Sequence, residues 1–229
     1  EFASMTMQMH RLVEYLQCLP TTLISMDKVE ADDIISFLAQ GFGSKGHRVT
    51  IVSSDKDFLQ VVDDNVEVYS PIKKKIYKKR DVAEELGMIP ENYLIVKSLL
   101  GDNSDNLTGV KGLGIKTILK EFPGIINDPN FNLESIFSIC EEKLKTKKIF
   151  ARIVHEWDKV ETNYELMNLL EPRLSDQEIL YILNKIKQPT TSLQVQPFLR
   201  MLEIDKIEAL NKNVEGWLEV FRPLSTYQK

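Results

Sequence analysis

The pattern of apolar and polar positions predicts alternating helices and strands in the first half of the chain. Apolar residues at 6–19 follow helical spacing, which indicates an amphipathic helix, and 28–41 reads as a second helix. The segments TTLISM (21–26), RVTIVSS (48–54) and VEVYS (66–70) read as strands rich in β-branched residues. This alternation predicts an α/β fold with a mostly parallel sheet flanked by helices.

The pattern changes after about residue 90, where strand signals become rare. We therefore expect two regions, an α/β core over 1–107 and a helical region over 108–229. Helical periodicity is present in the segments NYLIVKSLLG, IKTILKEF, LESIFSICEEKL, IFARIVHEWDKV and SDQEILYILNKI.

Composition narrows the class of protein. With 43% hydrophobic and 28% charged residues, the chain has the balance of a soluble globular protein, and its apolar run YLIVKSLL is too short to span a membrane. Cys18 and Cys140 form no closely spaced pair, which favours a reducing cytosol, the host cytoplasm if the gene belongs to a phage. The three histidines lack zinc-type spacing, so we expect oxygen ligands for any metal.

Acidic residues gather in three short segments where elements change. Residues 30–33 (EADD) follow the first strand, 55–57 (DKD) follow the second, and 102–106 (DNSDN) follow a helix that ends at Gly101. Sites in parallel sheets form beyond the carboxyl ends of the strands, so the first two segments should share one edge. The net charge of −5 does not mark a nucleic-acid binder, but without these acids the balance is slightly positive.

Bringing these carboxylates together requires counter-charge. Two unit charges about 4 Å apart repel by roughly 4 kcal/mol at an effective dielectric near 20, against a total stability of about 5–15 kcal/mol. Divalent cations relieve the repulsion, and Mg²⁺ or Mn²⁺ prefers carboxylate and water oxygens. Two such ions suit phosphodiester hydrolysis.

Each acidic segment also has a local explanation. Asp27 and Glu30 have the spacing of a capping box, and the acids at 32–33 suit a helix dipole. Asp55 could cap the next helix, DFLQVV, and 105–106 could be turn residues. These explanations do not account for three acidic pairs on one side of the molecule, so we favour a functional site.

A glycine-rich turn follows the third acidic segment. Its glycines permit positive φ and close approach of backbone N–H groups to a phosphate. The turn opens a helix, whose N-terminus favours an anion, so 108–122 resembles a helix-hairpin-helix. A plain connection between helices is the alternative. The candidate DNA-binding residues of this turn are Gly109, Lys111, Gly112, Gly114 and Lys116.

A basic stretch, IKKKIYKKR, supplies further candidates for phosphate contact. Lys73, Lys74 and Lys75 would make binding of a duplex sensitive to salt. The alternative is an edge strand that its lysines protect against aggregation.

In this order, VEADD, SSDKDF and LLGDNSDNL-x-GVKGLGIK resemble the motifs of the 5′-to-3′ nuclease and flap endonuclease family. They are especially similar to those of the ribonuclease H (flap nuclease) of tailed phages. The resemblance implies a PIN-like fold and a structure-specific 5′ nuclease, with Asp55, Asp57, Asp102 and Asp105 catalytic. The metal ligands that it implies are Glu30, Asp32, Asp33, Asp55, Asp57, Asp102 and Asp105.

The same resemblance implies cofactors and partners. It suggests two Mg²⁺ ions, replaceable by Mn²⁺, and a K⁺ ion at the helix-hairpin-helix. The substrates would be branched or 5′-flap DNA and RNA–DNA hybrids, and the protein would act as a monomer that removes RNA primers. A sliding clamp or single-strand-binding protein would be a partner, and no membrane would be involved.

One part of the family pattern is missing before residue 6. Members begin with a strand that carries a metal-binding Asp and continue into a helical arch, and we expect this chain to lack both. Two alternatives to a nuclease therefore stay open: a non-catalytic fragment that binds branched DNA, and a PIN-like single-strand ribonuclease.

Overall fold

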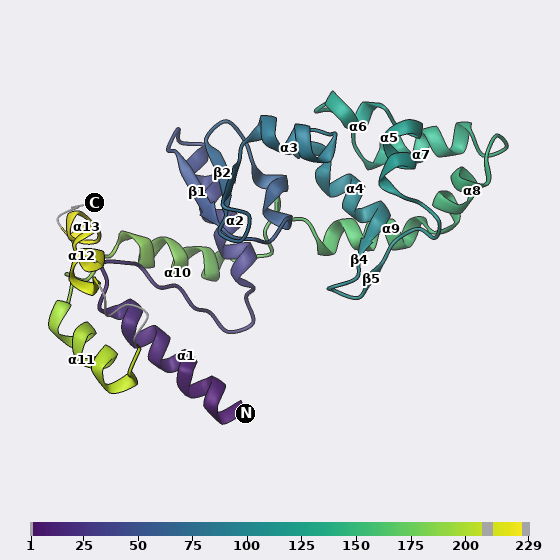
Figure 1. The fold of residues 1–229 in the computed structure, drawn as a ribbon. Helices are drawn as coiled ribbons and strands as arrows, with labels where there is room; N and C mark the ends of the chain where they lie inside the picture. The colour runs from purple at the N-terminus through teal and green to yellow at the C-terminus, as the bar shows by residue number, and fades with distance from the viewer. Residues whose placement is uncertain (1, 208–212, 226–229) are drawn as a thin grey trace. The chain divides into compact units, whose positions relative to one another are not determined.

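The computed structural model describes residues 2–207 and 213–225 of the chain (Figure 1). The chain divides into two compact units. The larger unit is Val29–Arg173, and the smaller unit combines Glu1–Lys28 with Leu174–Lys229.

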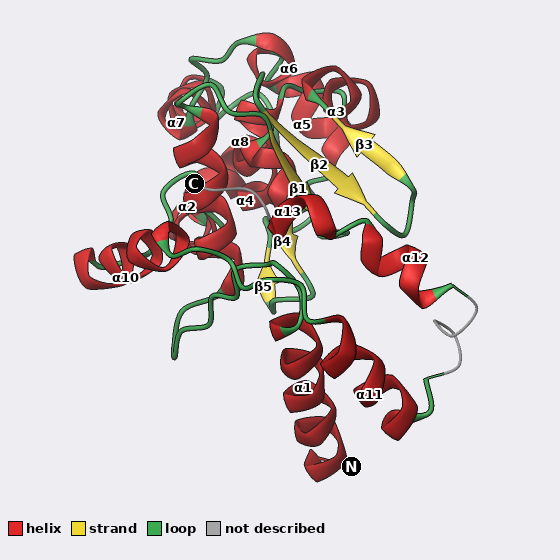
Figure 2. Ribbon diagram, turned by 90° about the vertical axis from the view of Figure 1, so that its left-hand side faces the viewer, coloured by secondary structure: helices red, strands yellow, loops and turns green. Residues whose placement is uncertain are grey.

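A three-stranded mixed sheet lies in the larger unit (Figure 2). Strands β1 (Val49–Val52) and β2 (Val66–Ser70) pair in parallel, and β3 (Lys75–Tyr77) pairs antiparallel with β2. Side chains of β2 alternate between buried and half-buried positions, as expected of a strand with one face on the core. The predicted strands at 48–54 and 66–70 are confirmed, and the lysine-rich stretch forms an edge strand.

Helices surround the sheet and continue the unit beyond it. α4 packs along α9, and the short strands β4 (Gly101–Asp102) and β5 (Leu107–Thr108) form a hairpin after α4 (Figure 1). The helical elements are α2 (Ala31–Gly43), η1 (Asp57–Val61, a 3₁₀ helix), α3 (Lys79–Leu86), η2 (Pro90–Asn92, also 3₁₀), α4 (Tyr93–Leu100), α5 (Ile115–Glu121), α6 (Gly124–Asn127), α7 (Leu133–Glu142), α8 (Lys148–His155) and α9 (Trp157–Leu166).

The boundary expected at residue 107 falls inside the larger unit. One hydrophobic core runs from Ile51 of the sheet through Leu99 of α4 to Val160 of α9, so strands and helices share a single interior. Because burial joins elements that differ in secondary structure, the change of pattern near residue 90 did not mark a domain boundary. The segment IFARIVHEWDKV also forms two helices, which meet at Glu156.

The strand expected at 21–26 is wrong. These residues form no helix and no strand, and they belong to the smaller unit. A strand needs a partner for its backbone N–H and C=O groups, and none of the described strands pairs with this segment. The sheet is therefore smaller and less parallel than expected.

The smaller unit consists of helices around a compact apolar cluster. α1 confirms the helix predicted at 6–19, and its Arg11 and Tyr15 both bind Asp205 of α11, at 3.0 Å and 2.8 Å. Cys18 and Cys140, one in each unit, are free and buried. Among the described residues, no helix has the length and apolar character needed to cross a membrane. The helices are α1 (Phe2–Gln17), α10 (Asp176–Lys187), α11 (Val195–Asp205), α12 (Val214–Glu219) and α13 (Arg222–Ser225).

Candidate metal centre

The three acidic segments lie on three elements of the larger unit. Residues 30–33 surround the N-terminus of α2, residues 55–57 join β1 to η1, and residues 102–105 lie in the β4–β5 hairpin. The β1 strand and the α4 helix thus each deliver an acidic segment at their carboxyl ends.

Carboxylates from the second and third segments converge. Asp57, Asp102 and Asp105 each offer one oxygen, and these oxygens lie within 4.8 Å of one another. Opposite ligands of a Mg²⁺ ion lie about 4.2 Å apart, at about 2.1 Å from the metal. Small side-chain rotations would therefore bring all three oxygens into one coordination shell, and this donor set fits a hard divalent cation.

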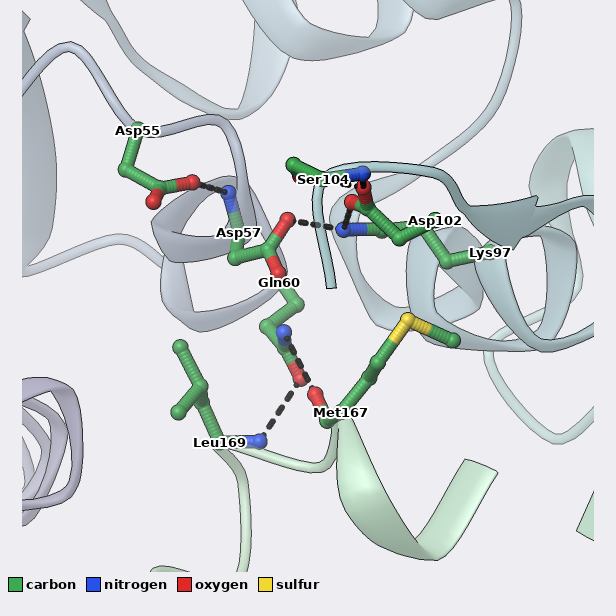
Figure 3. A network of polar contacts seen from close by, with 8 residues as sticks. All are labelled: Asp55, Asp57, Gln60, Lys97, Asp102, Ser104, Met167 and Leu169. Atoms are coloured by element: carbon green, nitrogen blue, oxygen red, sulfur yellow. Dashed lines mark hydrogen bonds and ion pairs between the residues drawn. The ribbon is translucent and has the colours of Figure 1, made fainter. Parts of the chain in front are cut away.

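A buried lysine already lies among these carboxylates (Figure 3). Lys97 projects from α4, and its Nζ contacts Asp57 and lies 2.7 Å from an oxygen of Asp102. The side chain of Lys97 is only 9% exposed. A buried charge needs a partner of opposite charge, and these carboxylates supply it. The presence of Lys97 shows that this group of acids attracts positive charge.

The pKa values in the cluster follow from burial and from Lys97. The Lys97 ammonium, with Ser104, lowers the pKa of Asp102 to about 2. Burial raises the pKa of Asp57, although the hydrogen bond from Lys97 offsets part of this effect. Burial by itself would lower the pKa of Lys97, but the hydrogen bonds to Asp102 and Asp57 outweigh it and the pKa rises. Lys97 is therefore charged at neutral pH.

The first acidic segment is electrostatically coupled to the second. Burial raises the pKa of Asp32, and the charges of Asp55, Glu30 and Asp57 raise it further, with a smaller effect of Asp33. The structure thus brings the segments at 30–33 and 55–57 close together. The assignment of these residues as metal ligands stays a prediction.

Of the local explanations, one is supported in part, for the second segment. The side chain of Asp55 accepts a hydrogen bond from the N–H of Asp57, the first residue of η1, at 2.9 Å, although the N-cap residue is Lys56. Asp33 accepts the N–H of Arg173 at 3.1 Å. The capping box expected of Asp27 and Glu30 is absent, because Glu30 is the N-cap residue of α2 and makes no side-chain cap hydrogen bond.

The glycine-rich turn connects the β4–β5 hairpin to α5. Gly112 has a φ of 77°, which confirms that the turn needs a left-handed residue. Arg152 of α8 donates to the carbonyl of Lys111, and the backbone N–H of Lys111 binds the Glu156 carboxylate. Contact of Lys111 with a phosphate would therefore involve its side chain. Gly112, Gly114 and Lys116 are exposed, whereas Gly109 is half-buried.

The comparisons with known proteins point to one family. Residues 3–87 match the family described as "5'-3' exonuclease, N-terminal resolvase-like domain". A 5′-3′ exonuclease of Aquifex aeolicus is 33% identical over 203 residues, which cover 85% of this chain and 65% of the relative. These similarities support the 5′-3′ exonuclease (5′ nuclease) family for this chain.

Other relatives agree with this assignment and with the fold. A 5′-3′ exonuclease of Buchnera aphidicola is 38% identical over 145 residues, 62% of this chain and 50% of the relative. The chain thus spans 50% to 65% of the length of these two relatives. A solved mutant of the T5 5′-exonuclease shares the fold, with a TM-score of 0.54, 23% identity, and coverage of 79% of this chain and 68% of that one. The predicted PIN-like α/β class is confirmed.

The basic stretch is largely paired within the protein. The ammonium groups of Lys73 and Lys75 lie 2.8 Å and 3.0 Å from the Glu85 carboxylate, and Lys73 also contacts Tyr77 at 3.0 Å. The hydrogen bonds from both lysines lower the pKa of Glu85 to about 2. Lys74 is exposed, with a φ of 51°. A phosphate would have to compete with Glu85, so the role of these three lysines in DNA binding stays a prediction.

Lys97 was not among the predicted site residues, although the sequence contains a signal for it. It is the charged residue within the apolar run YLIVKSLL, immediately before the third acidic segment. A lysine on a fully buried helix needs a carboxylate partner, and the nearest carboxylate along the chain is Asp102. Arg152 and Glu156 carry no comparable signal, because they contact the turn only through the packing of α8 and α9.

Proposed function

We propose that the protein to which this chain belongs is a structure-specific 5′ nuclease that hydrolyses phosphodiester bonds in branched DNA with divalent metal ions. The observation that supports this most directly is the convergence of Asp57, Asp102 and Asp105, two of which also bind a buried lysine. A bacteriophage T5 flap endonuclease, solved in a pseudo-enzyme-product complex with DNA and metal ions, shares the fold at 22% identity, with a TM-score of 0.54 and coverage of 80% of this chain and 62% of that one.

In this proposal Mg²⁺ is the natural ion, and Mn²⁺ replaces it. Asp57, Asp102 and Asp105 would hold one ion, and Asp32, Asp55 and Glu30 would contribute to a second. Bound ions supply charge that lowers the pKa of a water molecule and stabilises the leaving oxygen. The carboxylates hold and orient this charge, and Lys97 neutralises two of them when no metal is bound.

The glycine-rich turn would bind the duplex next to the cleavage point. Exposed backbone at Gly112 and Gly114, with the charge of Lys116, could contact phosphates without reading the base sequence. The substrates would be 5′ flaps and RNA primers at replication forks, and a sliding clamp or single-strand-binding protein would be a partner.

The test measures cleavage of a labelled 5′-flap DNA by the complete protein, with Mg²⁺ and with EDTA. Asp57→Asn and Asp102→Asn should lower the cleavage rate by at least about 100-fold, because removing a group that stabilises transition-state charge costs this much in other enzymes. Flap binding, measured in Ca²⁺, should change little. Undiminished cleavage by either variant would contradict the site.

Asp64→Asn is the matched control. Asp64 precedes β2, whereas the acidic segment at 55–57 follows β1, and the two strands are parallel. Asp64 therefore lies at the opposite end of the strands, and its substitution should leave cleavage unchanged. Flap binding without cleavage in Mg²⁺ or Mn²⁺ would favour a non-catalytic DNA-binding protein. Faster cutting of unpaired RNA than of the flap would favour a single-strand ribonuclease.

A further inference from the structure

Buried polar side chains of the larger unit converge on one segment, the end of α9 and the residues after it. We call residues 163–173 the clasp segment. Ser36, Gln60 and Asn163 are all at most 3% exposed, and each forms at least one hydrogen bond to or from this segment. Burying an amide costs free energy unless it is hydrogen-bonded, so these contacts call for an explanation.

The first contact fixes the hairpin that carries the third acidic segment. The Nδ2 of Asn163 donates to the carbonyl of Ser98, at 3.0 Å, and to the carbonyl of Thr108, at 3.1 Å. Ser98 precedes the hairpin on α4, and Thr108 ends it on β5. A single side chain of α9 therefore ties together the two ends of the loop that presents Asp102 and Asp105.

The second contact fixes the 3₁₀ helix that begins with Asp57. The amide of Gln60 donates to the carbonyl of Met167 at 3.1 Å, and it accepts the N–H of Leu169 at 3.0 Å (Figure 3). The amide thus acts both as a donor and as an acceptor, as a backbone peptide group does when two strands pair. Because η1 is only five residues long, this contact also sets the position of Asp57.

The third contact fixes α2, the helix that begins with the first acidic segment. The carbonyl of Leu169 accepts hydrogen bonds from Ser36 and from Gln40, the latter at 3.0 Å. The N–H of Arg173 donates to the carboxylate of Asp33 at 3.1 Å. The clasp segment is therefore hydrogen-bonded to the three elements that flank the acidic segments, and directly to Asp33 of the first segment.

We infer that the clasp segment positions the metal centre: Asn163, Gln60 and Ser36 act through it to hold three acid-bearing elements in register. Apolar packing alone tolerates sliding and repacking, whereas a hydrogen bond fixes two atoms at one separation. The repulsion among the carboxylates opposes their approach, so an arrangement that stays in place without metal needs such directional contacts. This inference rests on the proposed metal-dependent function.

The chain offers a matched control for Asn163. Asn92 is also a buried asparagine, and its Nδ2 also donates to two backbone carbonyls, of Ile125 at 3.0 Å and of Asp128 at 2.8 Å. Neither carbonyl belongs to an acidic segment of the candidate site. Asn92→Leu and Asn163→Leu therefore remove the same chemistry at two places, one away from the carboxylates and one that holds their loop.

The test measures Mn²⁺ binding to the full chain by calorimetry, with the melting temperature recorded separately in EDTA. We expect both asparagine variants to melt at a lower temperature than the unaltered protein. Only Asn163→Leu should weaken Mn²⁺ binding, by about 10-fold or more, as is usual when the groups that orient metal ligands are lost. Gln60→Met, which keeps the length of the side chain, should weaken binding in the same way and serves if Asn163→Leu does not fold.

The outcomes separate this inference from the proposed function. If the unaltered protein binds no Mn²⁺, the metal centre itself is wrong. If it binds Mn²⁺ and the variants Asn163→Leu and Gln60→Met bind it as tightly as Asn92→Leu does, the metal centre stands and the positioning role of the clasp segment is refuted.

Discussion

At the scale of single residues, Lys97 neutralises part of the charge of the acidic cluster when no metal is bound. It is a buried cation between Asp57 and Asp102, on a helix whose other residues are almost all apolar. The electrostatic environment that would bind a metal ion also retains this ammonium group. A metal ion and Lys97 would therefore neutralise the same carboxylates. When one of the two positive charges is removed, the other contributes more to the stability of the cluster.

Lys97→Met should destabilise the metal-free protein by about 3 kcal/mol, because removing one partner leaves buried charges without compensation. Addition of Mg²⁺ should recover more stability in this variant than in the unaltered protein, since the ion then has uncompensated carboxylates to neutralise. Urea denaturation in EDTA and in Mg²⁺ measures both effects.

Lys159→Met is the control for this prediction. Lys159 forms an ion pair with Glu156 while 37% exposed, and exposed pairs contribute less than about 1 kcal/mol. An equal loss of stability for the two variants in EDTA would show that Lys97 is not a buried counter-ion.

At the scale of elements, the β4–β5 hairpin depends on close backbone packing at its base. A Cβ added to Gly109 would lie 2.0 Å from the carbonyl oxygen of Leu100, and one added to Gly101 would lie 2.3 Å from the N of Gly109. Gly101 also has a φ of 73°, a conformation that other residues rarely adopt. The hairpin that presents Asp102 can therefore close only with glycine at both positions.

Gly109→Ala should lower the free energy of unfolding by at least about 2 kcal/mol, because backbone atoms must move to admit the methyl group. Gly41→Ala is the control. Gly41 lies in α2 with nothing within 4 Å of an added Cβ, so alanine there should stabilise the protein by up to about 1 kcal/mol. Denaturant titration of the two variants measures the difference. A neutral effect of Gly109→Ala would contradict the packing at the hairpin base.

At the scale of the whole molecule, the two units differ in how much core each contains. The larger unit buries one apolar cluster that joins strands and helices, whereas the cluster of the smaller unit centres on Phe198 and Leu202 with few fully buried neighbours. Stability within a protein follows the local density of buried contacts. The two units are therefore expected to open with different free energies.

Native-state amide hydrogen exchange should show this difference. Amides of α1 and α11 in the smaller unit should exchange through openings of lower free energy than amides of β2 and α4 in the larger one. Addition of Mg²⁺ should raise protection in the larger unit, because a ligand stabilises the unit that binds it. Equal protection of both units would contradict this division of the molecule.

The sequence by itself determined the chemistry of the candidate site. The signals for it are local: carboxylates at the ends of elements, and a glycine turn a few residues after the last of them. The structure places Asp57, Asp102 and Asp105 together. The strands at 48–54 and 66–70 were predictable for the same reason, because β-branched runs bounded by polar residues carry their own signal. The lysine-rich stretch contains the edge strand β3, which the sequence offered only as the alternative to phosphate contact.

Only the tertiary structure decided which residues hold these parts in place. The strand expected at 21–26 fails because pairing depends on a partner elsewhere, and the boundary expected at residue 107 fails because one core crosses it. Gln60 and Asn163 belong to no motif, and each acts on a backbone atom 55 to 109 residues away. Local patterns record the propensities and the charges of a segment, but hydrogen bonds between distant segments exist only after the chain has folded.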